Sequence, residues 1–158
     1  MFEVVLFQPE IPPNTGNIIR LCAATGATLH LIEPLGFHLD DKGLRRAGLD
    51  YHEFATVARH VSLAELRAQL PGRRAFALTK HASTSLYQAQ FMAGDVLLFG
   101  SETSGLPATI STQLPLTAEL RIPMRAGIRS LNLANAVAVT LYEALRQCAP
   151  GITHSLLA

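Results

Sequence analysis

The chain has 158 residues, a formal net charge of +1, and a charged fraction of 16% against 49% hydrophobic residues. This length allows one domain with a proper hydrophobic core, and the small net charge lacks the basic excess that is typical of strong nucleic-acid binders. The charged fraction is well below the roughly 25% of an average soluble domain. Two interpretations follow: a compact α/β core, or, as we favour, an apolar face that is buried in a homodimer.

Cysteine and histidine usage gives no sign of a disulfide framework or a metal centre. The chain has two cysteines, Cys22 and Cys148, and its six histidines are scattered without the spacing of metal ligands. The N-terminus lacks a basic leader, and no apolar run reaches the length of a membrane span. We therefore expect a soluble, cytoplasmic protein that needs no metal and contacts no membrane.

Apolar runs and helical patterns alternate along the chain. In chain order we expect a strand at 3–7, a helix at 14–24, a strand at 28–32, helices at 41–47 and 62–70, strands at 74–78 and 95–99, a short helix after Pro107, a strand at 119–122 and a helix at 132–147. The prolines at 12 and 13 are expected to prevent helix formation before Asn14, and Gly26 is expected to end that helix. Residues 79–85 are expected to form a polar loop.

This alternation predicts the α/β class. The strand at 95–99 contains an unbroken apolar run, as in a parallel strand that is covered on both faces. We expect a single domain over residues 1–158, with a mainly parallel sheet flanked by helices. Ligands of such sheets bind beyond the carboxyl ends of the strands, so residues 78–80, 100–106 and 123–129 should lie on one rim.

A glycine-containing loop follows the strand at 95–99 and reads FGSETSGLP over residues 99–107. It is not a P-loop, because Leu106 and Pro107 stand where a Walker sequence needs Lys and then Ser or Thr. Glu102 places a carboxylate among small residues directly after a buried strand. This glutamate is either an exposed turn residue or part of a binding site.

Residues 12–20, PPNTGNIIR, place one arginine in an apolar segment. Arg20 needs anionic or carbonyl partners there, because an unpaired buried guanidinium is costly. Its partner is either an internal carboxylate or the phosphate of a ligand or RNA that is met at an interface.

Residues 129–137 open the last helix. Ser130 and Asn132 both suit an N-cap, and the free N–H groups of a helix start also favour an anionic ligand. Further along, Tyr142 and Arg146 form an i, i+4 pair that could face solvent, a second subunit or RNA.

Three sets of segments, 14–20, 98–102 with 105–107, and 122–124 with 130–137, resemble the three motifs of the SPOUT (SpoU–TrmD) RNA methyltransferases, in the same order and at the ends of the expected elements. The resemblance covers essentially the whole chain, including residues 45–52, and is closest to the small tRNA (cytidine/uridine) 2′-O-methyltransferases that modify the wobble nucleotide. It implies the SPOUT α/β-knot, with a C-terminal deep trefoil knot, and an obligate homodimer. The chain differs from relatives with an appended RNA-binding domain.

The resemblance also implies S-adenosylmethionine as cofactor and the anticodon stem-loop of tRNA as substrate, with leucine tRNAs favoured. The residues implied in cofactor binding are Leu78, Thr79, Gly100, Glu102, Ile122, Met124, Ser130 and Leu131. Those implied around the reacting centre are Arg20, Asn17, Glu102, Ser130 and Asn132, with Arg20 supplied by the partner subunit. Candidate RNA contacts are Arg45, Arg46, Arg125, Arg129, Tyr142 and Arg146.

Other functions stay open at this point. An enzyme of this kind could methylate another ribose in tRNA or ribosomal RNA, or a base nitrogen, and a homologue could bind RNA or confer antibiotic resistance without turnover. A small-molecule α/β enzyme would need catalytic acid–base pairs that the sequence does not show. Arg20, Glu102, Ser130 and Asn132 are all present, which favours an active methyltransferase.

Overall fold

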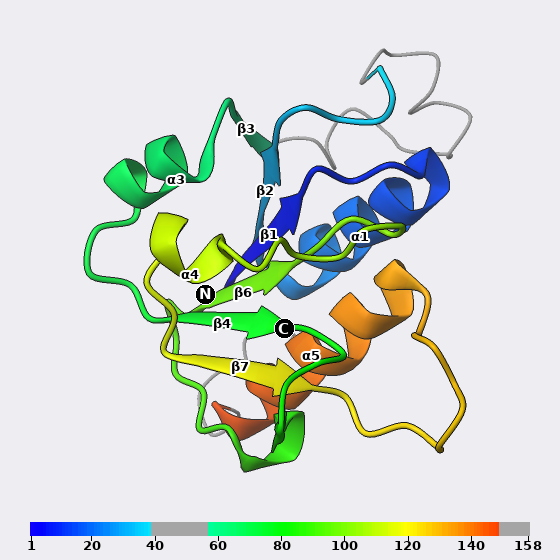
Figure 1. Ribbon diagram of the computed structural model, residues 1–158. Helices are drawn as coiled ribbons and strands as arrows, with labels where there is room; N and C mark the ends of the chain where they lie inside the picture. The colour runs from blue at the N-terminus through cyan, green and yellow to red at the C-terminus, as the bar shows by residue number, and fades with distance from the viewer. Residues whose placement is uncertain (39–56, 149–158) are drawn as a thin grey trace.

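A computed structural model describes residues 1–38 and 57–148 of the chain (Figure 1). The expected helix at 41–47 and the candidate RNA contacts Arg45 and Arg46 lie outside these residues. Within them, seven strands form one sheet in the order β3-β2-β1-β6-β4-β7-β5. The strands are β1 (Glu3–Phe7), β2 (Thr28–Ile32), β3 (Val57–His60), β4 (Ala75–Leu78), β5 (Thr84–Ser85), β6 (Val96–Phe99) and β7 (Ala118–Arg121).

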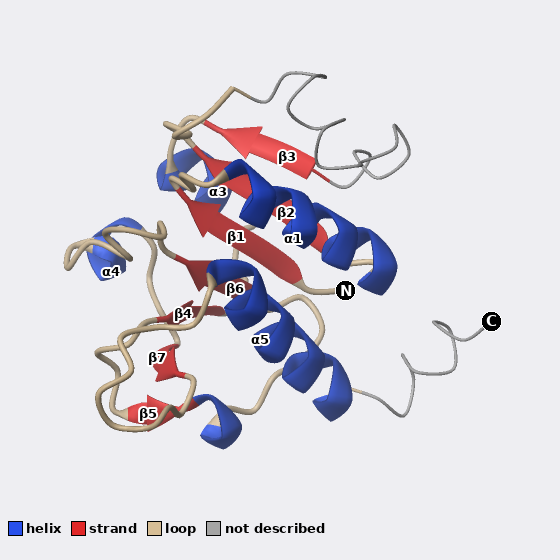
Figure 2. Cartoon of the chain, turned by 90° about the vertical axis from the view of Figure 1, so that its right-hand side faces the viewer, coloured by secondary structure: helices blue, strands red, loops and turns tan. Residues whose placement is uncertain are grey.

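Every pair of neighbouring strands in this sheet is parallel. The helices are α1 (Pro12–Thr25), α3 (Leu63–Gln69), the 3-10 helix η2 (Leu86–Gln88), α4 (Ile110–Gln113) and α5 (Leu133–Gln147). Figure 2 shows α1 and α5 side by side on one face of the sheet, with α3 and α4 on the other. The expected α/β class with a parallel sheet flanked by helices is therefore confirmed.

Two hydrophobic cores lie on the two faces of the sheet. Along β1, Val4 and Leu6 pack into the core under α1 and α5, while Val5 packs into the core under α3 and α4. All four residues of β6 are buried, which confirms the prediction of a strand covered on both faces. Each such side chain contributes about 1.5–3 kcal/mol to folding, so this central strand is a major source of stability.

Helix α1 begins earlier than expected. The expectation that the prolines prevent helix before Asn14 is wrong, because Pro12 and Pro13 occupy the first helical positions. The N–H groups of those positions have no partner within a helix, so losing them to proline costs nothing there. The helix ends as expected at Gly26, whose φ of 72° lies in the left-handed region.

Two strands were absent from the sequence prediction. β3 is a short strand next to β2 at one edge of the sheet. β5 has two residues and lies within the segment 79–85 that was expected to be a polar loop, so that expectation is wrong for Thr84 and Ser85. Among the strands of the described residues, β5 pairs with β7 alone, a strand that comes later in the chain, so its existence depends on a contact that its own sequence does not reveal.

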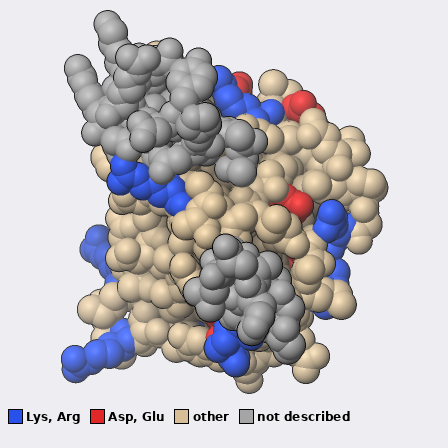
Figure 3. All heavy atoms as spheres, turned by 180° about the vertical axis from the view of Figure 1, so that it is seen from behind, with Lys and Arg blue, Asp and Glu red and all other residues tan. Residues whose placement is uncertain are grey.

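The surface has few charges for its area. On the face shown in Figure 3, uncharged side chains predominate, and the Lys and Arg side chains lie mostly towards the margin. No helix of residues 1–38 and 57–148 is both long and apolar enough to cross a membrane.

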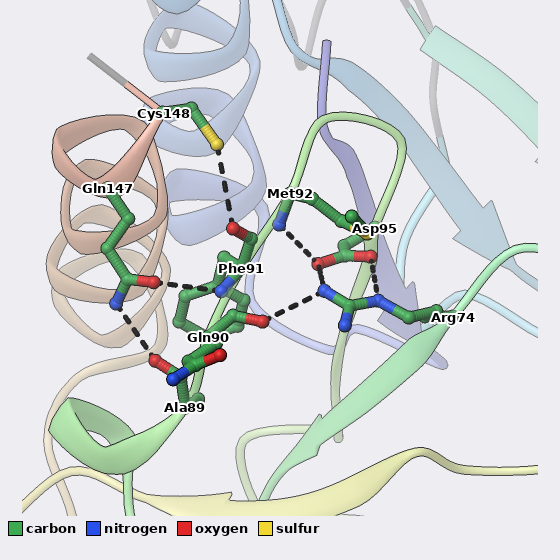
Figure 4. A network of polar contacts seen from close by, with 8 residues as sticks. All are labelled: Arg74, Ala89, Gln90, Phe91, Met92, Asp95, Gln147 and Cys148. Atoms are coloured by element: carbon green, nitrogen blue, oxygen red, sulfur yellow. Dashed lines mark hydrogen bonds and ion pairs between the residues drawn. The ribbon is translucent and has the colours of Figure 1, made fainter. Parts of the chain in front are cut away.

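A polar network fixes the end of α5 to the segment before β6 (Figure 4). The Gln147 side chain donates to the Ala89 carbonyl at 3.0 Å and accepts from the Phe91 N–H at 2.8 Å. Nearby, Arg74 donates to both oxygens of Asp95, at 2.8 and 2.6 Å. The Gln147 contacts hold α5 by its last turn, at the opposite end from its N-cap, and the Arg74–Asp95 pair joins the starts of β4 and β6.

A buried chain of polar side chains links the first three strands. Nε2 of His30 lies 3.0 Å from Oε2 of Glu3, and Nδ1 of His30 lies 2.9 Å from Nε2 of His60. Burial tends to raise the pKa of Glu3, but the hydrogen bond and charge of His30, with Thr28 and Arg73, outweigh it and lower that pKa. Burial, reinforced by His30 and opposed by Glu65, lowers the pKa of His60.

These two shifts predict acid sensitivity. As the pH falls through about 6.5, an unfolded histidine takes up a proton while folded His60 stays neutral, so the free energy of unfolding should decrease by up to about 1.4 kcal/mol per pH unit. Because the pKa of Glu3 is lower in the folded state, ionised Glu3 contributes stability that is fully present above about pH 4.5. This contribution is lost as the pH falls through the pKa of Glu3 in the folded protein. Urea unfolding at several pH values measures both losses.

His60→Gln should flatten the dependence between pH 7.5 and 5.5. The matched control is His38→Gln, since His38 is exposed. An unchanged slope in the His60 variant would contradict this account.

Candidate functional site

A cavity of about 600 Å³ lies at the carboxyl edge of the sheet. Its walls come from the loops after β4, β6 and β7 and from the start of α5, and these three strands are neighbours in the sheet. In Figure 1 their arrowheads point to the same edge. The expectation that residues 78–80, 100–106 and 123–129 share one rim is thus confirmed for the residues of each segment that line this cavity.

The cavity brings together all the residues that the sequence assigned to cofactor binding. They are Leu78, Thr79, Gly100, Glu102, Ile122, Met124, Ser130 and Leu131. Three of the five residues expected around the reacting centre also line it, namely Glu102, Ser130 and Asn132. The sequence placed Lys80 on this rim but gave it no role in the site, and it did not point to Asn14 or His81, although His81 comes soon after the predicted strand at 74–78.

The loop after β6 is folded tightly upon itself. Ser101 and Gly105 form an antiparallel bridge, with the Gly105 N–H donating to the Ser101 carbonyl at 3.0 Å. A Cβ atom on Gly100 would run into the backbone of Gly105 and Leu106, and Gly105 has a φ of 68°. Both positions therefore require glycine.

Glu102 joins this loop to the start of α1. Its carboxylate accepts hydrogen bonds from the Glu10 N–H at 2.8 Å, the Ile11 N–H at 3.2 Å and the side-chain amide of Asn14 at 3.0 Å. The N-cap residue of α1, Ile11, has no side chain that can cap the helix. Glu102 supplies a negative charge at this helix start from a distant part of the sequence, and it binds the backbone N–H groups of the two residues that precede the helix.

Asn14 extends the same network to α5. Its side-chain oxygen accepts from the amide of Asn132 at 2.9 Å, and Asn132 in turn caps α5 by accepting from Ala134 and Asn135 N–H groups at 2.9 and 3.3 Å. The prediction that one of Ser130 and Asn132 is an ordinary N-cap is confirmed for Asn132. Ser130 is exposed on the cavity wall, where its hydroxyl is accessible to a ligand.

The remaining two residues expected at the reacting centre lie elsewhere. Asn17 and Arg20 are exposed on α1, three residues apart on one side of the helix, and neither lines the cavity of the same chain. Arg20 was expected in apolar surroundings, and that expectation is wrong: it lies at the surface, because Ile18, Ile19 and Cys22 take the buried side of α1.

The described candidate RNA contacts are spread over two regions. Arg125 and Arg129 lie in the loop between β7 and α5 and line a second cavity. Tyr142 and Arg146 are exposed on α5, where Arg146 donates to Glu143 at 2.8 and 2.9 Å. The hydrogen bonds from Arg146 and Gln147 lower the pKa of Glu143 to about 2, so this pair is charged at neutral pH.

Neither a reactive cysteine nor a metal centre is found among residues 1–38 and 57–148. Burial raises the pKa of the Cys22 thiol to about 12, which makes it a poor nucleophile, and neither Cys22 nor Cys148 lines the cavity. In the part of the chain that the structure describes, no three His, Cys, Asp or Glu side chains are grouped to hold a metal ion.

Comparison with known proteins shows to which family the chain belongs. Residues 1–142 match the model of the SpoU rRNA Methylase family. A tRNA (cytidine(34)-2′-O)-methyltransferase from Escherichia coli is 57% identical, covering 93% of this chain and 94% of that protein, and one from Aeromonas hydrophila is 58% identical, covering 93% and 94%.

Solved structures agree. One solved structure, described as giving structural insights into the 2-OH methylation of C/U34 on tRNA, matches with a TM-score of 0.84 and 49% sequence identity. The match covers 93% of this chain and 95% of the chain in that structure. The SpoU methyltransferase AviRb from Streptomyces viridochromogenes, in complex with the cofactor AdoMet, has a TM-score of 0.78 at 29% identity and covers 92% and 57%. The resemblance inferred from the three motifs is therefore confirmed: the chain belongs to the SpoU methylase family.

Proposed function

We propose that this chain is an S-adenosylmethionine-dependent tRNA methyltransferase that modifies the ribose 2′-hydroxyl of the wobble cytidine or uridine, with leucine tRNAs among its substrates. One observation carries the proposal: a single cavity is lined by all eight residues that the motifs assign to cofactor binding. The relatives named for 2′-O-methylation at cytidine 34 support the choice of substrate.

The cavity suits the cofactor in size and in lining. Its volume of about 600 Å³ falls within the range of about 300–1,000 Å³ that is usual for pockets of such ligands. Leu78, Ile122 and Leu133 offer apolar surface for a flat ring. No other atom lies within 4 Å of the position that a Cβ atom on Gly105 would take, so a ligand has room there. When bound, the cofactor supplies a methyl group on a positively charged sulfur.

The protein's part in the reaction is to orient the ribose and to stabilise the negative charge that develops on its 2′-oxygen. For the methyl group to pass to the 2′-oxygen, its carbon–sulfur bond would break in line to leave a neutral thioether, and the hydroxyl proton would go to solvent water; positioning supplies much of the acceleration. Ser130, exposed on the cavity wall, is suited to hold that hydroxyl. Arginine stays protonated in proteins, so Arg20 is assigned the adjacent phosphate and the developing negative charge, with Asn17 beside it.

Glu102 and Asn132 act on the reaction indirectly. The polar atoms of both side chains are engaged in the network that caps α1 and α5. Their role is to hold the loop after β6 and the start of α5 at a fixed separation across the cavity, so that Ser130 stays in place.

The active form is a homodimer in which Arg20 enters the cavity of the partner subunit. Arg20 and Asn17 do not line the cavity of their own chain, which supports delivery from a second copy. The adjoining helices α1 and α5 also expose apolar and small residues, including Val139, Tyr142, Ala23 and Ala24. A low charged fraction of 16% agrees with burial of such a face.

The C-terminal segment forms a trefoil knot in this proposal. Support comes from the strand order, because β7 lies between β4 and β5 although it follows both in the chain. Residues 79–83 must therefore cross the carboxyl end of β7, and the chain leaving β7 toward α5 has to pass this crossing.

Methyl transfer to tRNA tests the proposed function directly. Purified protein incubated with labelled methyl donor and bulk tRNA should place label on the 2′-oxygen of cytidine or uridine at the wobble position, as read by nucleoside mapping. Label on a base, or on a ribose elsewhere in the tRNA, would contradict the assignment.

Mixing two inactive variants tests the shared site. Arg20→Ala and Ser130→Ala should each lower kcat by about a hundredfold or more, since each removes a group that acts in the transition state. Subunits exchanged between the two variants should recover about one quarter of the wild-type activity, because half of the dimers then contain one intact site. Activity that stays at the level of the single variants would show that Arg20 acts within its own chain.

Replacement of Glu102 tests the positioning role. Glu102→Gln should lower the free energy of unfolding by about 1–3 kcal/mol, because the amide nitrogen cannot accept the bonds that an oxygen now accepts. Affinity for the methyl donor, measured by calorimetry, should fall together with stability. Glu119→Gln, at an exposed position of β7, is the matched control and should change neither. Unchanged stability and affinity with abolished turnover would instead place Glu102 at the reacting atoms.

A further inference from the structure

A second cavity, of about 340 Å³, lies beside the cofactor cavity and has a basic lining. Its charged and titratable residues are Lys80, His81, Arg121, Arg125 and Arg129. Among the described residues that line it there is no Asp or Glu. A chain with a net charge of only +1 thus concentrates several of its cations in one concave place.

This cluster results from the parallel pairing of β4 and β7. Leu78 lies opposite Leu120 in the register of these strands, so the residues that follow each strand emerge next to each other. Lys80 and His81 follow β4, and Arg121 is the last residue of β7. The loop that carries Arg125 and Arg129 leaves β7 at the same edge, as Figure 1 shows.

The cations of this cavity are not used to hold the fold. Arg59, Arg74 and Arg146 form ion pairs with Glu33, Asp95 and Glu143, respectively. By contrast, Lys80, Arg121, Arg125 and Arg129 are exposed, and none of them pairs with an acidic side chain within residues 1–38 and 57–148. Mutual repulsion makes such a cluster unfavourable in the absence of an anion, so it is suited to binding one.

The two cavities share a wall, which fixes where that anion would lie. Lys80, His81, Ile122, Met124 and Arg129 line both of them. An anion in the second cavity would therefore lie next to the ligand of the first. In RNA, a ribose within the chain has a backbone phosphate on either side, so a phosphate is always a direct neighbour of the reacting 2′-hydroxyl.

We propose that the basic cavity binds the RNA backbone phosphate adjacent to the methylated ribose, with Lys80, Arg121 and Arg125 as its main cations. This inference rests on the proposed function. The planar guanidinium groups of Arg121 and Arg125 suit bidentate contact with phosphate oxygens, while Lys80 supplies a point charge at the shared wall. Such a local site lets a nearly neutral protein bind a polyanion at one defined position.

The test uses the double variant Arg121→Ala/Arg125→Ala in the full-length protein, because these two residues line only the second cavity. Its Kd for tRNA should rise at least tenfold, and the slope of log K against log salt should become shallower by about one for each phosphate that the variant no longer neutralises. Calorimetry should show an unchanged Kd for the methyl donor. The double variant Arg121→Lys/Arg125→Lys should retain most of the salt slope.

The matched control is Arg67→Ala, an exposed arginine on α3, which should leave the tRNA Kd unchanged. An unchanged tRNA Kd in the Arg121/Arg125 alanine variant would overturn the proposal. So would a rise in the Kd for the methyl donor alone, which would assign the cavity to an acidic group of the cofactor.

Binding of poly(U) separates this inference from the proposed function. If the wild-type protein transfers no methyl group to tRNA but the alanine variant still binds poly(U) at least tenfold more weakly, the phosphate site stands and the proposed activity fails. Equal binding of poly(U) by wild type and variant would overturn the site whatever the activity.

Discussion

The carboxylate of Glu102 is the group on which the geometry of the site depends. It accepts three hydrogen bonds at the start of α1, and Asn14 passes the connection to Asn132 at the start of α5. Three segments far apart in the sequence are thereby fixed around one point. Because Asn132 and Glu102 both line the cavity, a shift of either helix start would change the shape of the binding site itself. Under the proposed function, stability and ligand binding are therefore coupled through one side chain.

Much of this site could be predicted because its residues occur directly after apolar strands. The unbroken run at 96–99 identifies a buried parallel strand, and the polar residues that follow it must lie at the carboxyl edge. The same holds for Leu78 and Ile122, which end or follow β4 and β7. The start of α5 was also predictable, since Asn132 is a residue type that caps helices through its own side chain.

Other features could not be read from local sequence because they depend on distant contacts. Helix α1 has an isoleucine at its N-cap, and the group that compensates for it, Glu102, lies 91 positions further along the chain. β5 is formed by its pairing with β7, its one neighbour among the strands that the structure describes. The basic cavity was predicted in part: Arg125 and Arg129 were candidate RNA contacts and Arg121 precedes them in the same segment, but Lys80 joins them only because β4 lies next to β7 in the sheet.

The position of β7 has a consequence for the order of assembly. This strand fills the place between β4 and β5, although the ribosome makes it after both. A nascent chain that ends before Ala118 therefore has no partner for Thr84 and Ser85, and the segment from Thr79 to the η2 turn has nothing to lie across. The wall that this segment gives to the cavity is completed only when the last strand has been inserted, so a ligand-competent pocket arises late in synthesis.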